Sequence, residues 1–302
     1  MKRTYKIIAV LILVTSGVIA TVFSTIYHDV KTTANEMYIP VIAELPASRE
    51  VVVNVDLGDP FSVLILGVDE RQGDQGRSDT MIVLTVNPTL ETTKLLSIPR
   101  DTYTEIIGEN IQDKINHAYA FGGVEMSVKT VEHLLDIPID YVAKINMESF
   151  VELIDIVGDI SVENKLDFDY EGQHFQKGLL QLDGESALKY VRMRYDDPEG
   201  DFGRQNRQKQ IIQGVMQNSL HVNTIVNYKS ILKTLENHVE TNVMLDEMLA
   251  MRKNYSNSFK NIEQHYLIDG TGKKMNGIYY YLLNDTELEL LQETLKKHLA
   301  LD

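Results

Sequence analysis

The sequence contains no cysteine among its 302 residues, which excludes disulfide frameworks and thiol catalysis. It also lacks any run of Lys and Arg longer than two residues, and 44 acidic against 29 basic side chains leave a net charge of −15. Such a chain repels nucleic acid as a whole, so we expect no nucleic-acid partner. No internal repeat is visible, and the length suits one large domain or two small ones.

Several catalytic and metal-binding patterns are absent as well. The eight histidines show no zinc-binding spacing, and the aspartates lack the Asp-x-Asp-x-Asp-Gly order of an EF-hand. The stretch "GESAL" at 184–188 is not the Gly-x-Ser-x-Gly turn of a serine hydrolase. The sequence therefore argues against zinc sites, EF-hand calcium sites and serine-nucleophile chemistry.

What is present begins with an uncharged apolar segment, residues 7–26, that follows the basic residues Lys2, Arg3 and Lys6. Twenty helical residues span roughly 30 Å, the thickness of the hydrocarbon core of a bilayer. The basic flank keeps residues 1–6 in the cytoplasm, too few for a DNA-binding module. We expect a single-pass signal anchor in the cell membrane with the remaining chain outside. A signal peptide cleaved after Ala20 is the alternative.

The rest of the chain alternates between strand and helix patterns. Residues 27–58 form an expected extracellular stalk, in which "VVVNV" at 51–55 is either a first strand or a linker. Short apolar runs predict buried strands, and residues with helical spacing predict helices between them. The predicted strands are 61–67, 80–87, 92–98, 141–146 and a short one after the turn at Gly158, and the predicted helices are 124–135, 148–157, 184–191 and 204–216. This alternation predicts an α/β fold with a layered central mixed β-sheet flanked by helices.

Two segments divide this expected domain. Residues 59–220 form the catalytic core, and residues 221–302 form a helix-rich C-terminal part of the same domain. The C-terminal part ends with two strands around a Gly turn and a helix that Asn284 caps, with Glu287 three positions on.

Arginine is unevenly distributed, and its planar side chain gives paired hydrogen bonds to phosphate or carboxylate. Seven of the ten arginines lie in three places: Arg71 and Arg77, then Arg100, then Arg192, Arg194, Arg204 and Arg207. Helical spacing places Arg204, Arg207 and Gln208 on the stripe that continues to buried Ile211. An inward arginine needs an anionic partner. That partner is either a carboxylate of the protein or a polyanionic ligand, and the clustering favours the ligand.

Two aspartates flank neighbouring predicted strands. Asp69 directly follows the first strand and Asp79 directly precedes the second, so both lie at one sheet edge if the strands pair. This arrangement suits Mg²⁺, which takes one or two carboxylates together with waters and substrate phosphates. Turn capping is the structural alternative for both residues. Asp74, between glycines in the same loop, is expected to be solvated.

Six segments, in order, resemble the LytR-CpsA-Psr family of cell-envelope proteins. They are "LGVD" at 66–69, "RSDTM" at 77–81, "SIPRDT" at 97–102, "DKINHAYAFGG" at 113–123, "LKYVRMR" at 188–194 and "DFGRQNRQ" at 201–208. The resemblance implies an α/β domain with a hydrophobic cavity beneath a charged mouth. It also implies a transferase that moves a glycopolymer, such as teichoic acid or capsule polysaccharide, from polyprenyl pyrophosphate to peptidoglycan in a Gram-positive envelope.

The resemblance also assigns roles to residues. Asp69 and Asp79 are expected to hold Mg²⁺. The expected pyrophosphate-binding residues are Arg77, Arg100, Lys114, Arg192, Arg194, Arg204, Arg207 and Gln208, and the expected catalytic residues are Asp69, Arg100, Asp101, Arg192 and Arg194. Asp69 is the expected general base, and Asp101, Lys114 and Asn116 match further motif positions of the family. Asp159 stands where the family often has a second Gly, and residues 220–302 match only weakly.

The chemistry expected of these residues is phosphoryl transfer. A sugar hydroxyl of peptidoglycan attacks the phosphorus that carries the polymer, and polyprenyl phosphate leaves; positioning and charge neutralisation provide the catalysis. Helices 124–135 and 148–157 could line a trench for the polyprenyl tail, or simply form a core. A non-catalytic regulator that binds polyprenyl pyrophosphate and a pyrophosphate hydrolase are the alternatives. The sequence does not name the polymer, the acceptor hydroxyl or the oligomeric state.

Overall fold

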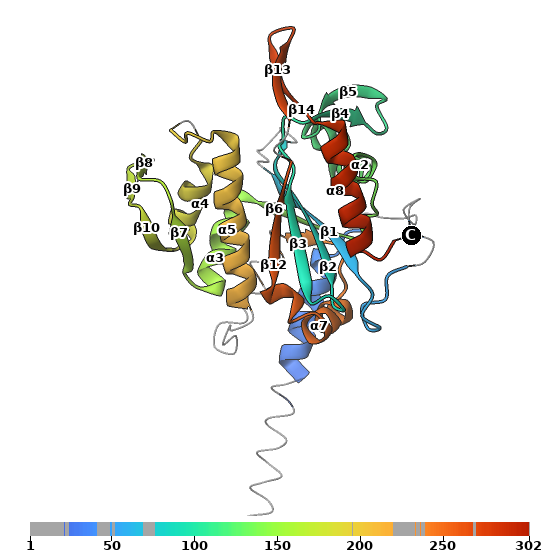
Figure 1. Cartoon of the computed structure of the whole chain (residues 1–302). Helices are drawn as coiled ribbons and strands as arrows, with labels where there is room; N and C mark the ends of the chain where they lie inside the picture. The colour runs from blue at the N-terminus through green and yellow to red at the C-terminus, as the bar shows by residue number, and fades with distance from the viewer. Residues whose placement is uncertain are drawn as a thin grey trace, which may run out of the picture.

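A six-stranded mixed sheet forms the centre of the computed structural model, with the strand order β11-β6-β1-β2-β3-β12 (Figure 1). The structure describes residues 21, 24–40, 49, 52–68, 76–194, 196–219, 233, 236, 239–267 and 270–301. The strands are β1 Phe61–Val68, β2 Ser78–Asn87, β3 Thr92–Ser97, β6 Tyr141–Asn146, β11 Val239–Thr241 and β12 Ile262–Tyr266. β1 runs antiparallel to β2 and parallel to β6, and β12 runs parallel to β3. The expected mixed sheet is therefore confirmed.

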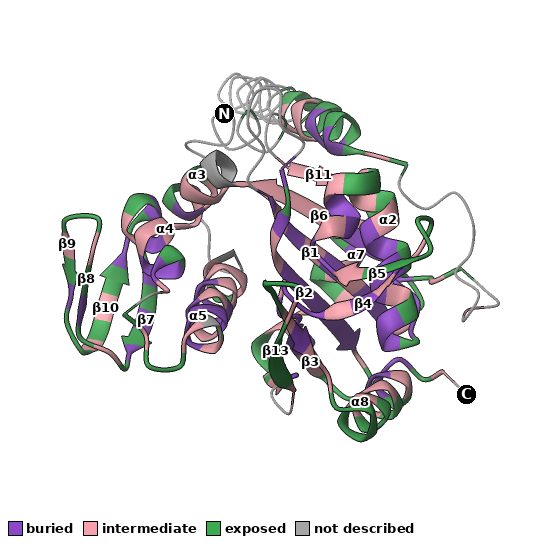
Figure 2. Cartoon of the chain, turned by 90° about the horizontal axis from the view of Figure 1, so that it is seen from above, coloured by how far each residue is buried: buried purple, intermediate pink, exposed green. Residues whose placement is uncertain are grey.

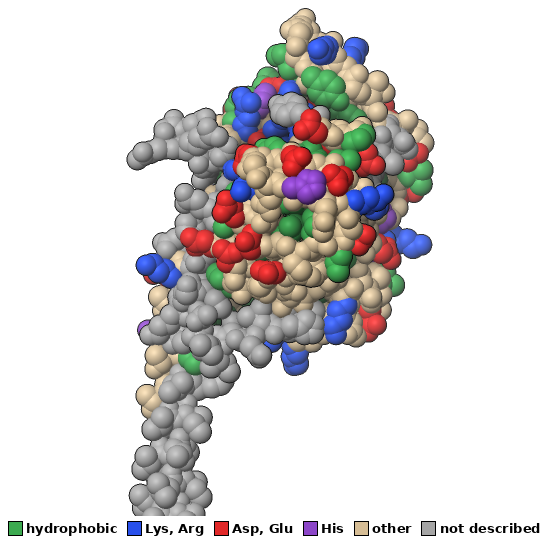
Figure 3. Space-filling view, turned by 90° about the vertical axis from the view of Figure 1, so that its left-hand side faces the viewer, with side chains coloured by type: hydrophobic (Ala, Val, Ile, Leu, Met, Phe, Trp, Pro, Cys, Tyr) green, Lys and Arg blue, Asp and Glu red, His purple; other side chains and the backbone are tan. Residues whose placement is uncertain are grey.

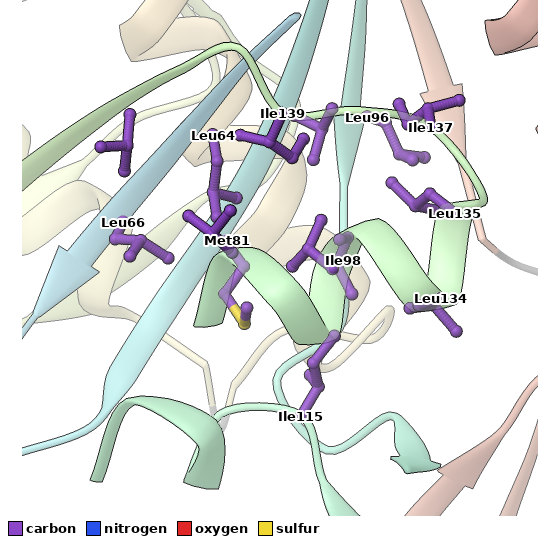
Figure 4. Packing of buried hydrophobic residues seen from close by; sticks show 14 of the residues in the cluster. Leu64, Leu66, Met81, Leu96, Ile98, Ile115, Leu134, Leu135, Ile137 and Ile139 are labelled. Carbon is purple, nitrogen blue, oxygen red and sulfur yellow. The ribbon is translucent and has the colours of Figure 1, made fainter. Parts of the chain in front are cut away.

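Both faces are buried at the centre of this sheet, which explains why β1 and β2 are continuous apolar runs. Leu64 and Leu66 of β1 pack on one face with Leu134 and Leu135 of α2 His117–Leu135 (Figure 4). α8 Asp285–His298 covers the same face. Phe61 and its neighbours on the other face pack against α7 Leu245–Asn254. The expected helices on both sides are confirmed.

The first of these helices begins earlier than the sequence pattern predicted. α2 starts at His117, and Gly122 and Gly123 interrupt it with non-helical backbone angles before it continues to Leu135. Gly123 has a φ of 63°, in the left-handed region that favours glycine. The glycine pair therefore marks a kink within the helix rather than its start.

A second body, residues 147–219, lies beside the central sheet and is called the satellite lobe below (Figure 2). Its elements are α3 Met147–Val157, β7 Ile160–Asn164, β8 Phe168–Tyr170, β9 Gln173–Phe175, β10 Gly178–Leu182, α4 Gly184–Arg192 and α5 Asp201–Ser219. Ile154 of α3 and Tyr190 of α4 belong to a core of its own. α2 and α3 thus bury their apolar faces in separate cores, which is the structural alternative to a shared trench.

The chain before β1 reaches the far edge of the sheet. Residues 24–37 are helical, and the amide of Ile39 donates to the carbonyl oxygen of Thr241 in β11 at 2.9 Å. Residues 52–60 contain no strand, so the described part of "VVVNV" is a connection. Most of the expected anchor at 7–26 lies outside the described residues, and no helix within the described ones is long and apolar enough to span a bilayer.

The C-terminal part contributes to the same sheet and ends in a projecting hairpin. β12 joins the central sheet, whereas β13 Thr271–Met275 and β14 Ile278–Leu282 form a separate hairpin (Figure 1). The sequence predicted two strands here, and the structure has three. The Asn284 side chain accepts from the amides of Thr286 and Glu287, which confirms the predicted cap of α8.

Candidate active site

The ends of three neighbouring strands lie together at one end of the central sheet and bring a first ion pair together. Val68 at the end of β1 pairs with Ser78 at the start of β2, and the chain leaves β3 at Ser97. Asp79 and Arg100 thereby become neighbours, and an Arg100 Nη1 atom donates to Asp79 Oδ1 at 2.7 Å. Both side chains keep about a quarter of their surface exposed, at 31% and 23%. The pair is therefore accessible to a ligand.

A second set of charges surrounds Asp101, the residue after Arg100. The β4 Tyr103–Ile106 and β5 Ile111–Lys114 hairpin places Lys114 so that its Nζ donates to Asp101 Oδ1 at 2.7 Å. Arg194, just beyond α4, brings Nη2 to 4.0 Å from the other carboxylate oxygen of Asp101. Side chains from two other segments thus approach one carboxylate.

Helix α5 reaches the same end of the sheet through Gln208. Its Nε2 atom donates to Thr80 Oγ1 at 2.9 Å, next to Asp79. A Cβ atom on Gly67 would lie 2.9 Å from Thr80 Cβ, closer than side chains tolerate, so the "LGVD" segment needs glycine there. Lys209, the next residue, is fully buried; burial lowers its pKa to about 7, and its Nζ donates to the carbonyl oxygen of His265.

Arg204 and Arg207 face inward, as the helical spacing predicted, and keep 9% and 5% of their whole-residue surface exposed. Arg207 donates to the carbonyl oxygens of Tyr190 and Met193 and forms an ion pair with buried Asp197. This guanidinium therefore holds the segment that carries Arg194. The sequence left two kinds of partner open for this arginine, a carboxylate of the protein or a polyanionic ligand. The structure shows a carboxylate of the protein.

For the remaining predicted residues, the structure gives no ion pair at this site or does not describe the residue. Arg77, just before β2, and Arg192, at the end of α4, are exposed. Within the described part of the chain, neither of them has an ion-pair partner. Asp69 lies outside the described residues, and so does Asp74. The roles expected of these residues stay predictions.

The carboxylates near this site bear on the expected Mg²⁺. No group of three or more His, Cys, Asp or Glu side chains among the described residues could hold a metal ion by itself. Asp79 offers one carboxylate at the sheet edge, beside Arg100. Because Mg²⁺ is commonly held by one or two carboxylates plus substrate phosphates, the residues present fit the ion together with a phosphorylated substrate.

Several residues at the site were missed by the sequence reasoning. The Tyr280 ring lies 5.7 Å from the Lys114 ammonium, and the Tyr281 amide donates to the Asp101 carbonyl oxygen at 2.8 Å. The three consecutive tyrosines at 279–281 were a visible signal, but only the hairpin brings them here.

Asp113 was also missed as part of this neighbourhood. It hydrogen-bonds to His117 at 2.7 Å. Burial acts to raise the pKa of Asp113, but hydrogen bonds from His117 and from the Lys114 amide outweigh it, so the pKa is below its usual range. Asp113 therefore stays ionised beside the cluster.

We call Asp79, Arg100, Asp101, Lys114 and Arg194 the sheet-end cluster. Its three cations outnumber its two carboxylates, in a protein whose net charge is −15. Locally concentrated arginine in such a setting suits phosphate groups, because the guanidinium fork matches their oxygen geometry. The fold and cluster define an α/β protein with a locally cationic group of side chains at the end of its central sheet.

The family follows from comparison with known proteins. The model of the LytR_cpsA_psr family matches residues 24–297, and the chain belongs to that family. Its sequence is 50% identical over 251 residues to the polyisoprenyl-teichoic acid–peptidoglycan teichoic acid transferase TagU of Bacillus subtilis, covering 83% of this chain and 82% of that one. The Bacillus cereus (strain AH820) TagU is 44% identical over 274 residues, covering 91% and 90%.

Solved structures share the fold. The crystal structure of B. subtilis TagU is 47% identical, with a TM-score of 0.66 over 80% of this chain and 97% of that one. The structure of TagT bound to LIIa-WTA is 32% identical, with a TM-score of 0.73 over 85% and 97%. An Enterococcus faecalis protein described as a transcriptional regulator is 39% identical, with a TM-score of 0.75 over 83% and 92%. The resemblance inferred from the six segments is thus confirmed.

Proposed function

We propose that this protein transfers a glycopolymer of the teichoic acid type from a polyprenyl-pyrophosphate carrier onto peptidoglycan. The observation that carries the proposal is the sheet-end cluster, in which Arg100 pairs with Asp79 while Lys114 and Arg194 approach the next residue, Asp101. The names of the 44–50% identical relatives, which describe this activity, support it.

The reaction requires one bond to form and one to break at phosphorus. An acceptor sugar hydroxyl forms the new O–P bond, the bond to polyprenyl phosphate breaks, and the hydroxyl proton passes to a carboxylate, for which Asp69 is our candidate. Arg100 and Arg194 bind the phosphate oxygens and stabilise the charge that develops there. Asp101 positions Lys114 through the 2.7 Å hydrogen bond and lies beside Arg194.

Other predicted residues extend this arrangement. We assign Arg77, Arg192 and Arg204 to the same diphosphate, and Gln208 to the adjoining edge through Thr80. Asp69 and Asp79 would hold Mg²⁺, which when bound neutralises charge on the phosphate oxygens. Arg207 serves this site by positioning the Arg194 segment.

We also propose that residues 7–26 anchor the protein in the cell membrane, with the described part on the outer side of a Gram-positive cell. The apolar length and the basic flank of the sequence support this placement. The helix at 24–37 and the β13–β14 hairpin lie at opposite ends of the described molecule (Figure 1). An anchor before this helix would direct the hairpin away from the membrane.

The experiment combines the purified chain, a polyprenyl-pyrophosphate-linked polymer, peptidoglycan and Mg²⁺. Polymer linked to peptidoglycan and accumulating beyond one equivalent per protein supports the proposal. Free polymer phosphate as the only product indicates a hydrolase, and binding that stops at one equivalent indicates a regulator without turnover. Chelation of divalent ions by EDTA should abolish transfer, and restored Mg²⁺ should recover it.

A further inference from the structure

A groove of about 590 Å³ lies between α5 and β7 in the satellite lobe, separate from the sheet-end cluster. Its volume falls within the range of roughly 300–1,000 Å³ that is usual for small-ligand sites. One wall is a face of α5, and the other is β7 together with Tyr190. The proposed reaction leaves this groove without a role.

The α5 wall carries an unusual stripe of amide side chains. Asn206, Gln210, Gln213 and Gln217 follow one another at spacings of four, three and four residues, so they share one helix face. A helix face that only packs against its own protein is normally apolar. The stripe is therefore built for hydrogen bonding.

The opposite wall shows which of these amides are already engaged. β7 pairs with β10 on one side only, and Gln210 Nε2 donates to the carbonyl oxygen of Glu163 on β7 at 3.1 Å. The Tyr190 hydroxyl donates to Gln210 Oε1 at 2.9 Å. Gln213 and Gln217 line the same groove, and the structure describes no hydrogen-bond partner for either within the residues that it covers. They are the groups available to a ligand.

The chemistry of the walls restricts that ligand. Amides both donate and accept without charge, which suits hydroxyl and acetamido groups. The amide stripe on the α5 wall would lose its hydrogen bonds to water against an isoprenoid chain. Asp197 is paired with Arg207. The charges that remain in the lining are then the two carboxylates of Glu163 and Glu199 and the one ammonium of Lys165. The outward face of the lobe also presents many acidic side chains (Figure 3), so a phosphate polymer is disfavoured.

One chain segment links the groove to the sheet-end cluster. Asp197, at the groove wall, donates its amide to the Arg194 carbonyl oxygen at 3.4 Å. The Arg194 guanidinium in turn lies 4.0 Å from the Asp101 carboxylate. The segment 194–197 therefore joins the groove wall to the sheet-end cluster.

We propose that this groove binds an uncharged chain of N-acetylated sugars, and that this chain is the acceptor glycan. The inference rests on the proposed transfer to peptidoglycan and adds where the acceptor lies. Gln213 and Gln217 form hydrogen bonds to acetamido and hydroxyl groups, and the end of the chain points toward Arg194.

The first test is binding without turnover. Chitotetraose, an uncharged tetramer of N-acetylglucosamine, is titrated into the protein and followed by NMR and calorimetry. We expect shifts in the side-chain amide signals of Gln213 and Gln217, and roughly tenfold weaker binding in the Gln213→Ala/Gln217→Ala double variant, because two hydrogen bonds are lost. Gln176→Ala, an exposed amide of the same lobe outside the groove, is the matched control and should bind normally.

The second test is kinetic. The double variant should raise KM for the peptidoglycan acceptor roughly tenfold while KM for the donor and the kcat stay unchanged. A rise confined to the donor KM would place donor sugars in the groove and overturn the acceptor assignment. Shifts caused by a short extended peptide but not by chitotetraose would overturn the sugar assignment.

The two proposals fail separately. If the protein binds chitotetraose in the groove but yields no linked polymer with authentic substrates, the proposed transferase function falls and the sugar site remains. If transfer proceeds and the double variant matches the wild type in both tests, the groove inference falls alone. Far-UV circular dichroism of the double variant establishes that α5 is intact.

Discussion

Two arginine–aspartate pairs, one at the end of the central sheet and one in the satellite lobe, use the same chemistry in opposite settings. Arg100 and Asp79 are 2.7 Å apart and keep 23% and 31% of their side chains exposed. Arg207 and Asp197 keep only 7% and 5% exposed, and Arg207 also donates to two backbone carbonyl oxygens. The first pair can exchange a partner for a ligand, whereas the second holds the chain in place.

The contrast shows that the motif around an arginine does not determine whether it binds a ligand or stabilises the fold. Both arginines lie in segments that resemble the family's phosphate-handling motifs. A partly exposed ion pair adds little stability, about 0–1 kcal/mol, while loss of one partner of a buried pair costs about 3–5 kcal/mol. Mutations should therefore separate activity from stability.

The largest effect is expected at the exposed pair. Arg100→Ala should lower kcat for polymer transfer about a thousandfold, because a guanidinium at the transferring phosphate is removed. The free energy of unfolding, measured in urea, should change by less than about 1 kcal/mol. Arg252→Ala on α7 is the control and should retain full activity. Unchanged transfer by the Arg100 variant would remove the site from the proposed mechanism.

The buried pair should behave in the reverse manner. Arg207→Ala should lower the free energy of unfolding by about 3–5 kcal/mol, because Asp197 and two carbonyl oxygens lose their partner inside the protein. Arg192→Ala, at an exposed position in the same lobe, should change it by less than about 0.5 kcal/mol. Equal stability losses in the two variants would contradict the assigned difference.

A buried group without a charged partner extends the comparison to pH. His298 in α8 is 2% exposed, and its ring nitrogens hydrogen-bond to the hydroxyls of Thr85 and Thr92. Burial is the main cause that lowers its pKa to about 4 from the usual value of 6.5. The unfolded chain then binds a proton first as pH falls, so this contribution is present above pH 6.5 and is lost down to about pH 4.

We expect the loss to reach at most about 3 kcal/mol, from the 2.5-unit difference between 6.5 and 4. Urea unfolding of the wild type and His298→Gln between pH 7.5 and 4.5 measures it. The variant should lose less stability over this range than the wild type. Parallel pH profiles would show that His298 does not titrate as its surroundings indicate.

The smallest effects are expected at helix caps, one in each body. Asp183 Oδ1 accepts from the Ser186 amide at 2.8 Å and starts α4, the helix that leads to Arg192. Asn284 caps α8 beside the central sheet. Alanine at either position should cost about 1 kcal/mol in urea unfolding. A much larger loss at Asp183 would mean that α4 limits the stability of the satellite lobe.

Much of the fold was predictable because the strands at the centre of the sheet are buried on both faces. The run at 61–67 was recognised for that reason, the strand at 141–146 lies where it was expected, and the cap at Asn284 was recognised from its spacing. The start of α2 was missed, because a glycine pair normally ends a helix and here forms a kink. The hairpin at 271–282 was not separated from β12, since strand patterns do not reveal sheet membership.

The candidate site was predictable only in part. The strand-edge argument placed Asp79 correctly at the sheet edge, and helical spacing placed Arg204 and Arg207 inward. Neither argument could identify the side chain with which Asp79 or Arg207 forms an ion pair. Tyr280 reaches Lys114 across more than 160 residues of sequence, a proximity that only the folded chain creates.

The sequence by itself determined the alternation of strands and helices, the inward stripe of α5 and membership of the family, because periodicity and short motifs are local properties. Only the tertiary structure decided that Arg100 is partly exposed at the end of the central sheet and that Arg207 forms a buried ion pair with Asp197. The physical reason is that the role of a charge depends on its burial and its nearest opposite charge, and both are set by segments far apart in the chain.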